Sequence, residues 1–354
     1  RKAGVTPLVI ERQDVAAEAS SAAAGLLSPL GALPGSETFT RLILASWSMA
    51  PELIPELEAI SGVAVEYYRP GSLRLTTSTE GVTTLRQRMT AWQSLGIQAT
   101  WLAGEAITQH EPLLSPSVKA AVYAPQEGSI KAPALTRAYA EAAQKLGARF
   151  ALSTEAIGLR HSSSRITGIQ TARGETISCR HLVLASGAWS SSYGEWLGLS
   201  IPVSPMKGQI LSLKQPQRPL AHILFGEEVY LIPKQDGTIY VGATVEQAGF
   251  DKQVTAGAIA WLLSSAIRLV PELEHTPVVN MWAGLRPWSL DGHPILGKAP
   301  GWENVTLATG HSGMGFELSA ITGKTIAELI TTKHTSELIQ PFSIERFQGD
   351  DKPL

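Results

Sequence analysis

Cysteine is almost absent from this sequence of 354 residues, in which Cys179 is the only one. A single cysteine excludes an internal disulfide and any cysteine-based zinc or iron–sulfur centre, and it fits a reducing compartment. Because Cys179 follows Thr176-Ile-Ser in an expected strand, a half-buried packing role is the simplest interpretation. The eight histidines show no metal-ligand spacing, so we expect no metal site.

An excess of one charge and long apolar runs are also missing. The 29 Lys and Arg residues nearly balance the 31 Asp and Glu residues, so the net charge of −2 gives no electrostatic reason to bind nucleic acid or anionic lipid. No stretch approaches the roughly 20 apolar residues of a membrane span, and no charged-then-apolar leader occurs. We therefore expect a cytoplasmic protein with a small-molecule partner, no nucleic acid and no stable membrane insertion.

The glycine turn Gly-x-Gly-x-x-Gly, which opens dinucleotide-binding folds, does not occur anywhere in the chain. Leu8 to Ile10 nevertheless read as a buried strand, and Glu11 follows it. In such folds the acid that ends the second strand binds the adenosine ribose, and the glycine turn lies ~20 residues earlier. The turn and its strand are therefore expected before Arg1. The alternative interpretation of Glu11 is a solvated strand end.

Two further patterns fail on spacing. Thr322-Gly-Lys-Thr resembles the end of a phosphate-binding loop, but the earlier glycine that such a loop requires would stand at position 318, which is Leu318. Gly310-His-Ser-Gly lacks the spacing of a nucleophile elbow, because its fifth position is Met314. These failures remove the phosphate-loop and hydrolase classes.

Periodicity predicts an alternation of helices and strands with no repeat and no linker. Helices are expected as a pair within 38–60 and singly over 81–94, 133–146 and 256–269. Strands are expected over 149–183, in a hairpin that begins within 63–77, and in a second hairpin over 229–244 with its turn at Asp236-Gly237. Because no linker separates the segments, two domains would have to be interleaved.

The most informative pattern lies between residues 281 and 330. Val305 to Ala308 read as a short strand, Thr309 to Gly315 carry little side-chain bulk, and Phe316 to Ile330 repeat apolar residues at helical spacing. This order presents unpaired backbone N–H groups at a helix N-terminus, where a planar, electron-rich group could approach. Upstream, Arg286 stands among apolar residues and needs a carboxylate or phosphate partner, either a ligand or a buried structural ion pair.

Three motifs of this region are Trp282-Ala-Gly-Leu-Arg-Pro, Asp291-Gly-His-Pro-Ile-Leu-Gly, and Ala308-Thr-Gly-His followed by Gly315. They resemble the C-terminal signature of the FAD-dependent D-amino-acid oxidase superfamily, and within it the glycine oxidases of the thiamine pathway. The resemblance covers nearly the whole chain and implies a mixed α/β fold, in which a Rossmann-like FAD-binding domain is interleaved with an antiparallel-sheet substrate domain. The implied ranges are 1–60, 131–200 and 276–354 for the FAD-binding domain, and 61–130 and 201–275 for the substrate domain.

The same resemblance implies the residues of the site. Arg286 would bind the substrate carboxylate, assisted by the hydroxyl of Tyr230, although a tyrosine in a hairpin is more often cross-strand packing. Gly313 stands where many glycine oxidases have an arginine, so the contact of that side chain is lost. The implied FAD contacts are Glu11, Ser20, Ser21, Ala24, Gly25, Leu26, Ala156, Ser186, Gly187, Trp189, Gly284, His311, Ser312, Gly313, Met314 and Gly315.

The implied reaction is the FAD-dependent oxidative deamination of glycine or another small amino acid or amine. The substrate would become an imine and then a 2-oxo acid and ammonia, and oxygen would reoxidise the flavin and give hydrogen peroxide. A homo-oligomer and a role in thiamine thiazole synthesis are also implied. Two alternatives stay open: a D-amino-acid dehydrogenase that passes electrons to a membrane acceptor, and a cofactor-free remnant that acts only as a binding or structural protein.

Overall fold

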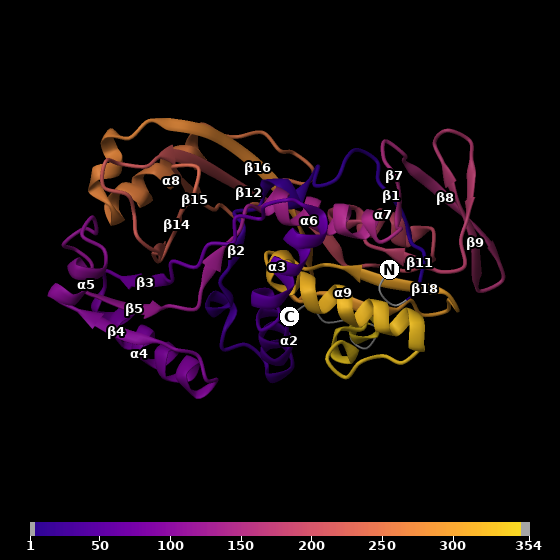
Figure 1. Cartoon of the computed structure of the whole chain (residues 1–354), viewed down its shortest axis with the longest axis horizontal. Coiled ribbons are helices and arrows are strands. Elements are labelled where there is room, and N and C mark those ends of the chain that lie inside the picture. Colours follow the sequence, from indigo (N-terminus) through magenta and orange to yellow (C-terminus); the bar gives the residue numbers. More distant parts are fainter. Residues whose placement is uncertain (1–3, 348–354) are drawn as a thin grey trace.

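The computed structural model describes residues 4–347 and divides its strands between one large sheet and several small ones. The large sheet occupies the left of Figure 1, the small sheets with β1, β8 and β11 lie on the right, and helices α2, α3 and α6 stand between them. The eight strands of the large sheet are, in spatial order, β16 (Val278–Ser289), β12 (Val203–Lys214), β15 (Thr238–Gly242), β14 (Tyr230–Pro233), β13 (Ile223–Phe225), β3 (Ser72–Thr76), β5 (Ala120–Ala124) and β4 (Thr100–Ala103).

The small sheets are built mainly from the rest of the chain. Two of them contain parallel pairs, β1 with β7 and β11 with β18, whereas the other pairings are antiparallel. The strands are β1 (Leu8–Ile10), β2 (Leu26–Leu27), β6 (Gly128–Ser129), β7 (Arg149–Ala151), β8 (Ala156–Ser162), β9 (Arg165–Thr171), β10 (Thr176–Ser178), β11 (Leu182–Leu184), β17 (Ile295–Lys298) and β18 (Val305–Thr309).

The carboxyl ends of the two parallel pairs meet in space. The guanidinium of Arg12, two residues past β1, lies 4.8 Å from the ring centre of Trp189, which follows β11. Ligands of open parallel sheets bind at such ends. The fold therefore brings the segments after β1 and β11 to one place, although they are distant in sequence.

The helices begin and end where the sequence supplies the required residues. Helix α6 has Pro133 near its start, where the missing N–H costs nothing, and Gly147 beyond its end has φ +96°. Gly62 ends α3 in the left-handed conformation with φ +77°. The helices are α1 (Ala19–Ala22), α2 (Glu37–Trp47), α3 (Ala50–Ser61), α4 (Thr79–Ser94), α5 (Glu105–His110), α6 (Ala132–Lys145), α7 (Ser190–Glu195), α8 (Ala256–Leu269) and α9 (Gly315–Thr332).

Two main apolar cores hold the halves of the molecule. One lies between the large sheet and helices α5 and α8, and it includes Leu211, Leu231 and Leu262, none of which is exposed. The other joins α2 to α9 through Leu42 and Leu318. Full burial of one such side chain contributes roughly 1.5–3 kcal/mol. The second core fixes α9, whose N-terminus is part of the site described below.

Most expected elements are confirmed, and one is wrong. The paired helices of 38–60, the hairpin at Asp236-Gly237 and the strand–turn–helix of 305–330 are all present. The hairpin expected to begin within 63–77 is absent from the described residues, because β3 pairs with β5 and β13 instead. Local alternation predicted the strand correctly, but the residues that pair with it lie 44 or more positions away.

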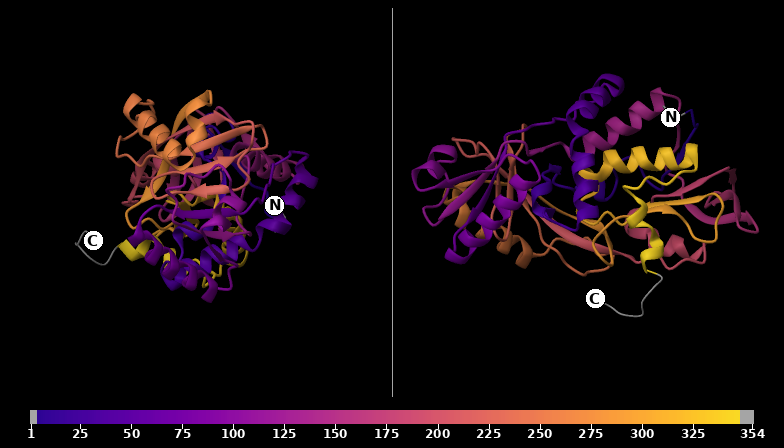
Figure 2. Two further views of the ribbon diagram at one scale, coloured as in Figure 1. Left: turned by 90° about the vertical axis from the view of Figure 1, so that its left-hand side faces the viewer. Right: turned by 90° about the horizontal axis from the view of Figure 1, so that it is seen from below.

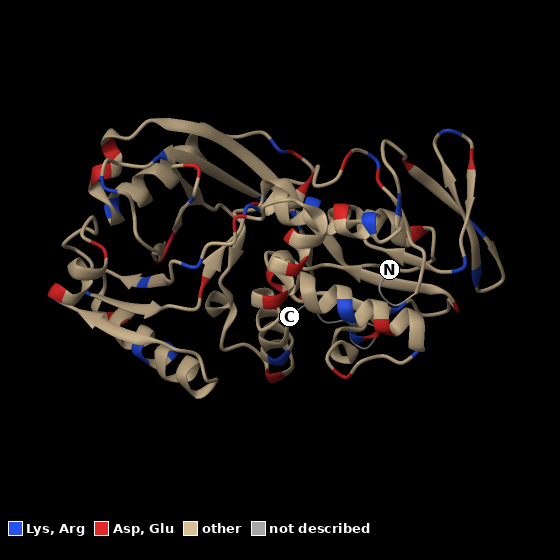
Figure 3. Ribbon diagram, in the orientation of Figure 1, with Lys and Arg blue, Asp and Glu red and all other residues tan. Residues whose placement is uncertain are grey.

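Strand β16 falls in the range predicted for the FAD-binding domain, yet it forms one edge of the large sheet and connects the two halves. The domain ranges therefore stay a prediction, and their ends at 1–3 and 348–354 lie outside the described residues. Figure 2 shows the two halves from other sides. Figure 3 shows the charged residues, and both signs are interspersed over the ribbon. Within residues 4–347, no helix combines the length and the hydropathy needed to cross a membrane.

Candidate active site

Arg286 lies on β16 directly beside two strand glycines. In the antiparallel pairing of β12 and β16, Met206 stands opposite Arg286 and Gly208 opposite Gly284, so these four residues share one face. A Cβ added at Gly208 would lie 2.4 Å from Nη1 and 2.5 Å from Nη2 of Arg286. The guanidinium therefore occupies the space that the missing side chain leaves.

The hydrogen bonds of Arg286 leave part of its guanidinium available. Nη1 donates to the carbonyl oxygens of Thr244 at 3.0 Å and Lys207 at 3.4 Å, and no acceptor among residues 4–347 is assigned to Nε or Nη2. Glu246 acts on Arg286 only through space, because its carboxylate contacts Lys207, and no described carboxylate lies within 4.0 Å of the guanidinium. Burial lowers the pKa of Arg286. A cation in this setting requires an anionic partner.

Tyr230 stands on β14 opposite Gly242 of β15, and its ring lies against that glycine. A Cβ at Gly242 would come within 2.5 Å of the hydroxyl oxygen. Burial is the main cause that raises the pKa of Tyr230 to about 12, so the phenol stays protonated and can donate. The positive charge of Arg286 acts in the opposite direction and lowers the pKa of Tyr230.

The glycine-rich turn after β18 is attached to β16 next to Arg286. The backbone N–H of Ser312 donates to the carbonyl of Pro287 at 2.9 Å, and Ser312 itself adopts φ +50°. A Cβ at Gly313 would lie 3.9 Å from Cδ of Arg286. The structure thus places the arginine and the bare turn side by side, as the sequence suggested.

This turn fits an electron-rich cofactor. The hydroxyl of Ser312 is buried and has no hydrogen-bond partner among the described residues, and Ser312 is only 7% exposed. Such a group normally finds a partner. Helix α9 begins at Gly315, so its unpaired N–H groups and positive dipole end lie at the same turn. The residues present therefore suit a flavin, which offers hydrogen-bond acceptors and becomes anionic on reduction.

The imidazole of His311 is directed to α9. Its Nε2 is 3.0 Å from the hydroxyl oxygen of Thr322, and burial lowers the pKa of His311 to about 4. The ring is therefore neutral at physiological pH and connects the turn to the helix. A contact between His311 and a flavin stays a prediction.

Small residues of the first predicted flavin segment pack on β16. A Cβ at Gly284 would lie 2.4 Å from the Cβ of Ala22, and Nε1 of Trp282 donates to the carbonyl of Ala22 at 2.9 Å. The chain then passes through Ala24 and Gly25, which has φ +74°. The segment that carries Ser20, Ser21, Ala24, Gly25 and Leu26 is therefore close to Arg286, whereas its contacts with FAD stay predictions.

A second group of predicted residues gathers at the ends of β1 and β11. The N–H of Thr154, two residues before Ala156, donates to the carbonyl of Glu11, and a carboxylate oxygen of Glu11 accepts the N–H of Gln13. After β11, the ring of Trp189 stacks on that of Phe250 with ring centres 5.2 Å apart. The nearby Ser186 hydroxyl lies 3.1 Å from that of Ser190. This arrangement suits the adenosine end of a dinucleotide, and these contacts also stay predictions.

Sequence reasoning missed a buried ion pair near the site. One nitrogen of Arg74 donates to both carboxylate oxygens of Glu127 at 2.9 Å and to the hydroxyl of Ser28. The guanidinium stacks on the ring of Phe225, 3.6 Å from its centre, and that ring packs edge-on against Tyr230. Alternation in the sequence predicted strand β3, but no local pattern predicted that Arg74 binds Glu127, which lies 53 residues away.

Replacing Glu127 by Gln should destabilise the protein strongly, because Arg74 would keep a buried and uncompensated charge. We expect the free energy of unfolding to fall by about 3–5 kcal/mol. Denaturant titration followed by circular dichroism measures this value. Glu303→Gln is the control, since Glu303 and Arg165 form an exposed pair and no measurable change is expected. Equal effects of the two substitutions would contradict the prediction.

Glu317, in the first turn of α9, is the second residue that the sequence did not reveal. It is 9% exposed, and burial is the main cause that raises its pKa to about 8. The backbone N–H of Ser28 and its own N–H oppose that shift, as does Arg74. From the sequence, an acid in the first turn of a helix is expected to be exposed and ionised, stabilised by the positive end of the helix dipole. Here the carboxyl is protonated at neutral pH instead.

The contribution of Glu317 to stability should therefore decrease as pH rises from about 4.5, the ordinary pKa of a glutamate, to about 8, the value in the fold. In that window the native state binds the proton that the unfolded chain has already lost. Glu317→Gln should remove this slope and be more stable than the wild type at pH 8. Denaturation midpoints measured from pH 5 to 9 test this, and a parallel slope in both proteins would contradict it.

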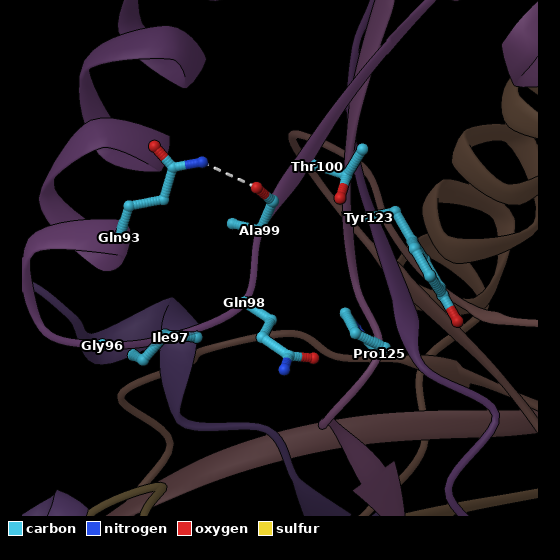
Figure 4. A pocket seen from close by; sticks show the side chains of 8 residues that line it. All are labelled: Gln93, Gly96, Ile97, Gln98, Ala99, Thr100, Tyr123 and Pro125. Atoms are coloured by element: carbon cyan, nitrogen blue, oxygen red, sulfur yellow. Dashed lines mark hydrogen bonds between the residues drawn. The ribbon is translucent and has the colours of Figure 1, made fainter.

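A surface groove of about 510 Å³ lies far from these residues (Figure 4). It runs between the end of α4 and strands β4 and β5, and Gln93, Gln98 and Tyr123 contribute neutral side chains to it. The amide of Gln93 is engaged with the carbonyl of Ala99 at 2.8 Å. Because β4 and β16 form opposite edges of the large sheet, this groove is separate from Arg286. It carries no charged side chain and no group suited to redox chemistry.

Comparison with known proteins agrees with the class that fold and site indicate, an oxidoreductase that uses a dinucleotide cofactor. The sequence model of the family described as "FAD dependent oxidoreductase" matches residues 1–329, and the chain belongs to this family. Glycine oxidase of Geobacillus kaustophilus (strain HTA426) is 34% identical over 343 residues, which cover 96% of this chain and 90% of that protein.

Two further comparisons extend this result. The crystal structure of glycine oxidase from Geobacillus kaustophilus superposes with a TM-score of 0.91 over 96% of this chain and 91% of that one. The bifunctional protein ThiO/ThiG of Trichormus variabilis (strain ATCC 29413 / PCC 7937) is 34% identical over 97% of this chain, which spans about half of that protein, 52%. The protein is thus a glycine oxidase-like, FAD-dependent oxidoreductase with a mixed α/β fold. The predicted family, fold class, enzyme class and cofactor are confirmed.

Proposed function

We propose that this enzyme oxidises glycine or another small amino acid or amine, with the carboxylate of an amino-acid substrate bound by Arg286 and Tyr230. The observation that carries the proposal is the state of Arg286: a half-buried cation without an ion-pair partner among residues 4–347, beside a bare turn. A carboxylate would accept hydrogen bonds from Nε and Nη2 in the bidentate geometry that guanidinium favours. The similarity to glycine oxidases supports a small substrate.

The residues of the chain bind and orient the substrate and do not carry the redox chemistry. Bound FAD would supply a two-electron acceptor for oxidation at Cα, so that the overall reaction would convert the amino acid, oxygen and water to a 2-oxo acid, ammonia and hydrogen peroxide. Because the pKa of Tyr230 is raised to about 12, its phenol stays protonated and donates to the carboxylate. The N-terminus of α9 and Ser312 stabilise negative charge at the turn.

The test is the absorbance of the protein loaded with FAD. Glycine should bleach the flavin bands under nitrogen, and admission of air should restore them with one hydrogen peroxide per imine formed. Sarcosine and small D-amino acids are the next substrates to compare. Bleaching that only an artificial dye reverses would favour a dehydrogenase instead. A protein that binds no flavin, or a flavin that no small amino acid bleaches, would overturn the proposal.

The similarity to ThiO/ThiG supports a further part of the proposal, namely that the imine produced serves the synthesis of the thiamine thiazole. In a strain that lacks its own glycine oxidase and requires thiazole, expression of this chain should restore growth. The Arg286→Met variant is the control, because it keeps the fold and loses the carboxylate contact. Growth that does not depend on Arg286 would contradict this role.

A further inference from the structure

The amine of Lys234 lies between the large sheet and two segments that cross from one half of the molecule to the other. These crossing segments are residues 22–26 and residues 128–130. Lys234 follows β14, and its Nζ donates to the carbonyl oxygens of Ala24 at 2.7 Å and Ile130 at 3.1 Å. Nζ also stands 4.9 Å from the ring centre of Tyr240 on β15. One side chain of the large sheet therefore contacts both crossing segments.

The two crossing segments are themselves in direct backbone contact. Strands β2 and β6 pair, and the N–H of Ile130 donates to the carbonyl of Gly25 at 2.8 Å. A Cβ at Gly25 would lie 2.2 Å from the carbonyl oxygen of Ile130, so only glycine permits this approach. Movement of one segment would therefore move the other, and Lys234 restrains both.

The amine of Lys234 has no ion-pair partner among residues 4–347. Asp236, Glu66 and Lys131 are the charged groups that act on it, each through space. Burial is the largest cause of its perturbation and lowers the pKa of Lys234 from 10.5 to about 7, whereas Asp236 and Glu66 oppose that shift. A lysine held by two carbonyl groups rather than by a carboxylate is suited to fixing a backbone position.

We propose that Lys234 is a positioning residue, which holds the small-residue segment 22–26 against the large sheet so that its backbone can approach the flavin. The proposal rests on the proposed function only in assigning that segment to the cofactor. Trp282 supports the same segment from β16 through its hydrogen bond to Ala22. Lys234 thus acts on the cofactor site through the backbone of Ala24 and Gly25, and touches no reacting atom.

The lowered pKa gives the positioning a definite pH dependence. If the segment opens and exposes the amine, Lys234 regains an ordinary pKa near 10.5 and takes up a proton. Opening is then favoured as pH falls from about 10.5 to about 7, and it no longer changes below about 7, where both states bind the proton. The segment is therefore held more firmly at alkaline pH.

Hydrogen–deuterium exchange of the FAD-loaded protein between pH 7 and pH 9 tests this. The protection factors of the amides of Gly25 and Ile130, corrected for intrinsic exchange, should rise with pH by up to about tenfold per unit. In Lys234→Met they should be about tenfold lower than in the wild type at pH 9 and independent of pH. In Lys234→Arg they should also be independent of pH, because guanidinium does not lose its proton in this range.

Lys145→Met is the matched control, since Lys145 donates to the carbonyl of Ser61 at 2.9 Å and not to a crossing segment. It should leave the protection of Gly25 and Ile130 and the affinity for FAD unchanged, whereas Lys234→Met should weaken FAD binding at least tenfold. Protection that does not vary with pH in the wild type, or pH dependence that persists in Lys234→Arg, would overturn the proposal. Failure of amino acids to bleach the flavin would overturn the proposed function alone, because the exchange data need no turnover.

Discussion

Substitution of Arg286 by Met lowers kcat/KM for the amino-acid substrate by about 10³-fold, because a buried charge pair with the substrate is lost. Lys at this position recovers little of the activity, since a single ammonium cannot form two parallel hydrogen bonds and would not reach the acceptors that now hold Nη1. The loss appears mainly in KM, because the carboxylate is bound equally in the ground state and in the transition state. Steady-state kinetics with FAD in excess measure both constants.

A carboxylate probe separates binding from turnover. Acetate, which binds like the substrate carboxylate and cannot be oxidised, should perturb the flavin spectrum of the wild type and not that of Arg286→Met. Arg165→Met is the control, since the Arg165 side chain is exposed at the start of strand β9, and it should behave as the wild type does. An Arg286→Met protein that keeps both the acetate response and full turnover would place the carboxylate site elsewhere.

The parts of the site that could be predicted from the sequence are those whose structure depends on residues close together in the chain. The strand, bare turn and helix of 305–330 follow from β-branched residues, glycines and helical spacing in one uninterrupted run. The hairpin that carries Tyr230 follows from Asp236-Gly237, where Gly237 has φ +80° and Asp236 accepts hydrogen bonds from Thr238. The neighbourhood of Arg286 and the turn followed only from the resemblance, and the bond from Ser312 to Pro287 now gives it a structural basis.

The remaining parts depend on contacts between residues distant in sequence. Arg74 on β3 binds Glu127, which lies 53 residues away in the loop between β5 and β6, and Lys234 reaches Ala24 over 210 positions. Nothing near Lys234 in the sequence distinguishes it from an exposed lysine after a strand, and Glu317 resembles an ordinary acid of a first helical turn. Only tertiary packing removes the water that would solvate these groups, and that loss of water is what changes their pKa values.

Glycines inside the strands are a further signal in the sequence. A glycine inside a strand weakens it, and it marks a place where another group approaches the backbone closely. Gly208 stands in the middle of β12 and Gly242 at the end of β15. The structure shows that the first makes room for Arg286 and the second for Tyr230. Strand glycines thus indicate where bulky functional side chains lie, although they do not reveal which ones.

Gly208→Ala should therefore impair the enzyme almost as much as loss of the arginine. The new methyl group would lie 2.4 to 2.6 Å from Nη1, Nη2 and Cζ, so the guanidinium must move away. A displacement of about 1 Å in a bound reactant costs about 10²-fold in rate, and we expect at least that loss in kcat/KM. Overpacking should lower the free energy of unfolding by about 1–3 kcal/mol. Gly257→Ala in α8 is the matched control, because nothing lies within 4 Å of the added methyl.

The combination of Gly208→Ala with Arg286→Met decides whether the glycine acts through the arginine. If the methyl group harms the enzyme only by displacing the guanidinium, it has nothing left to displace in the double variant, whose kcat/KM should equal that of Arg286→Met alone. Independent effects would multiply instead, giving a further loss of about 10²-fold. The free energy of unfolding should also recover in the double variant, because methionine is flexible and can leave space for the methyl group. Multiplicative losses would show that Gly208 serves the site in some way other than making room for Arg286.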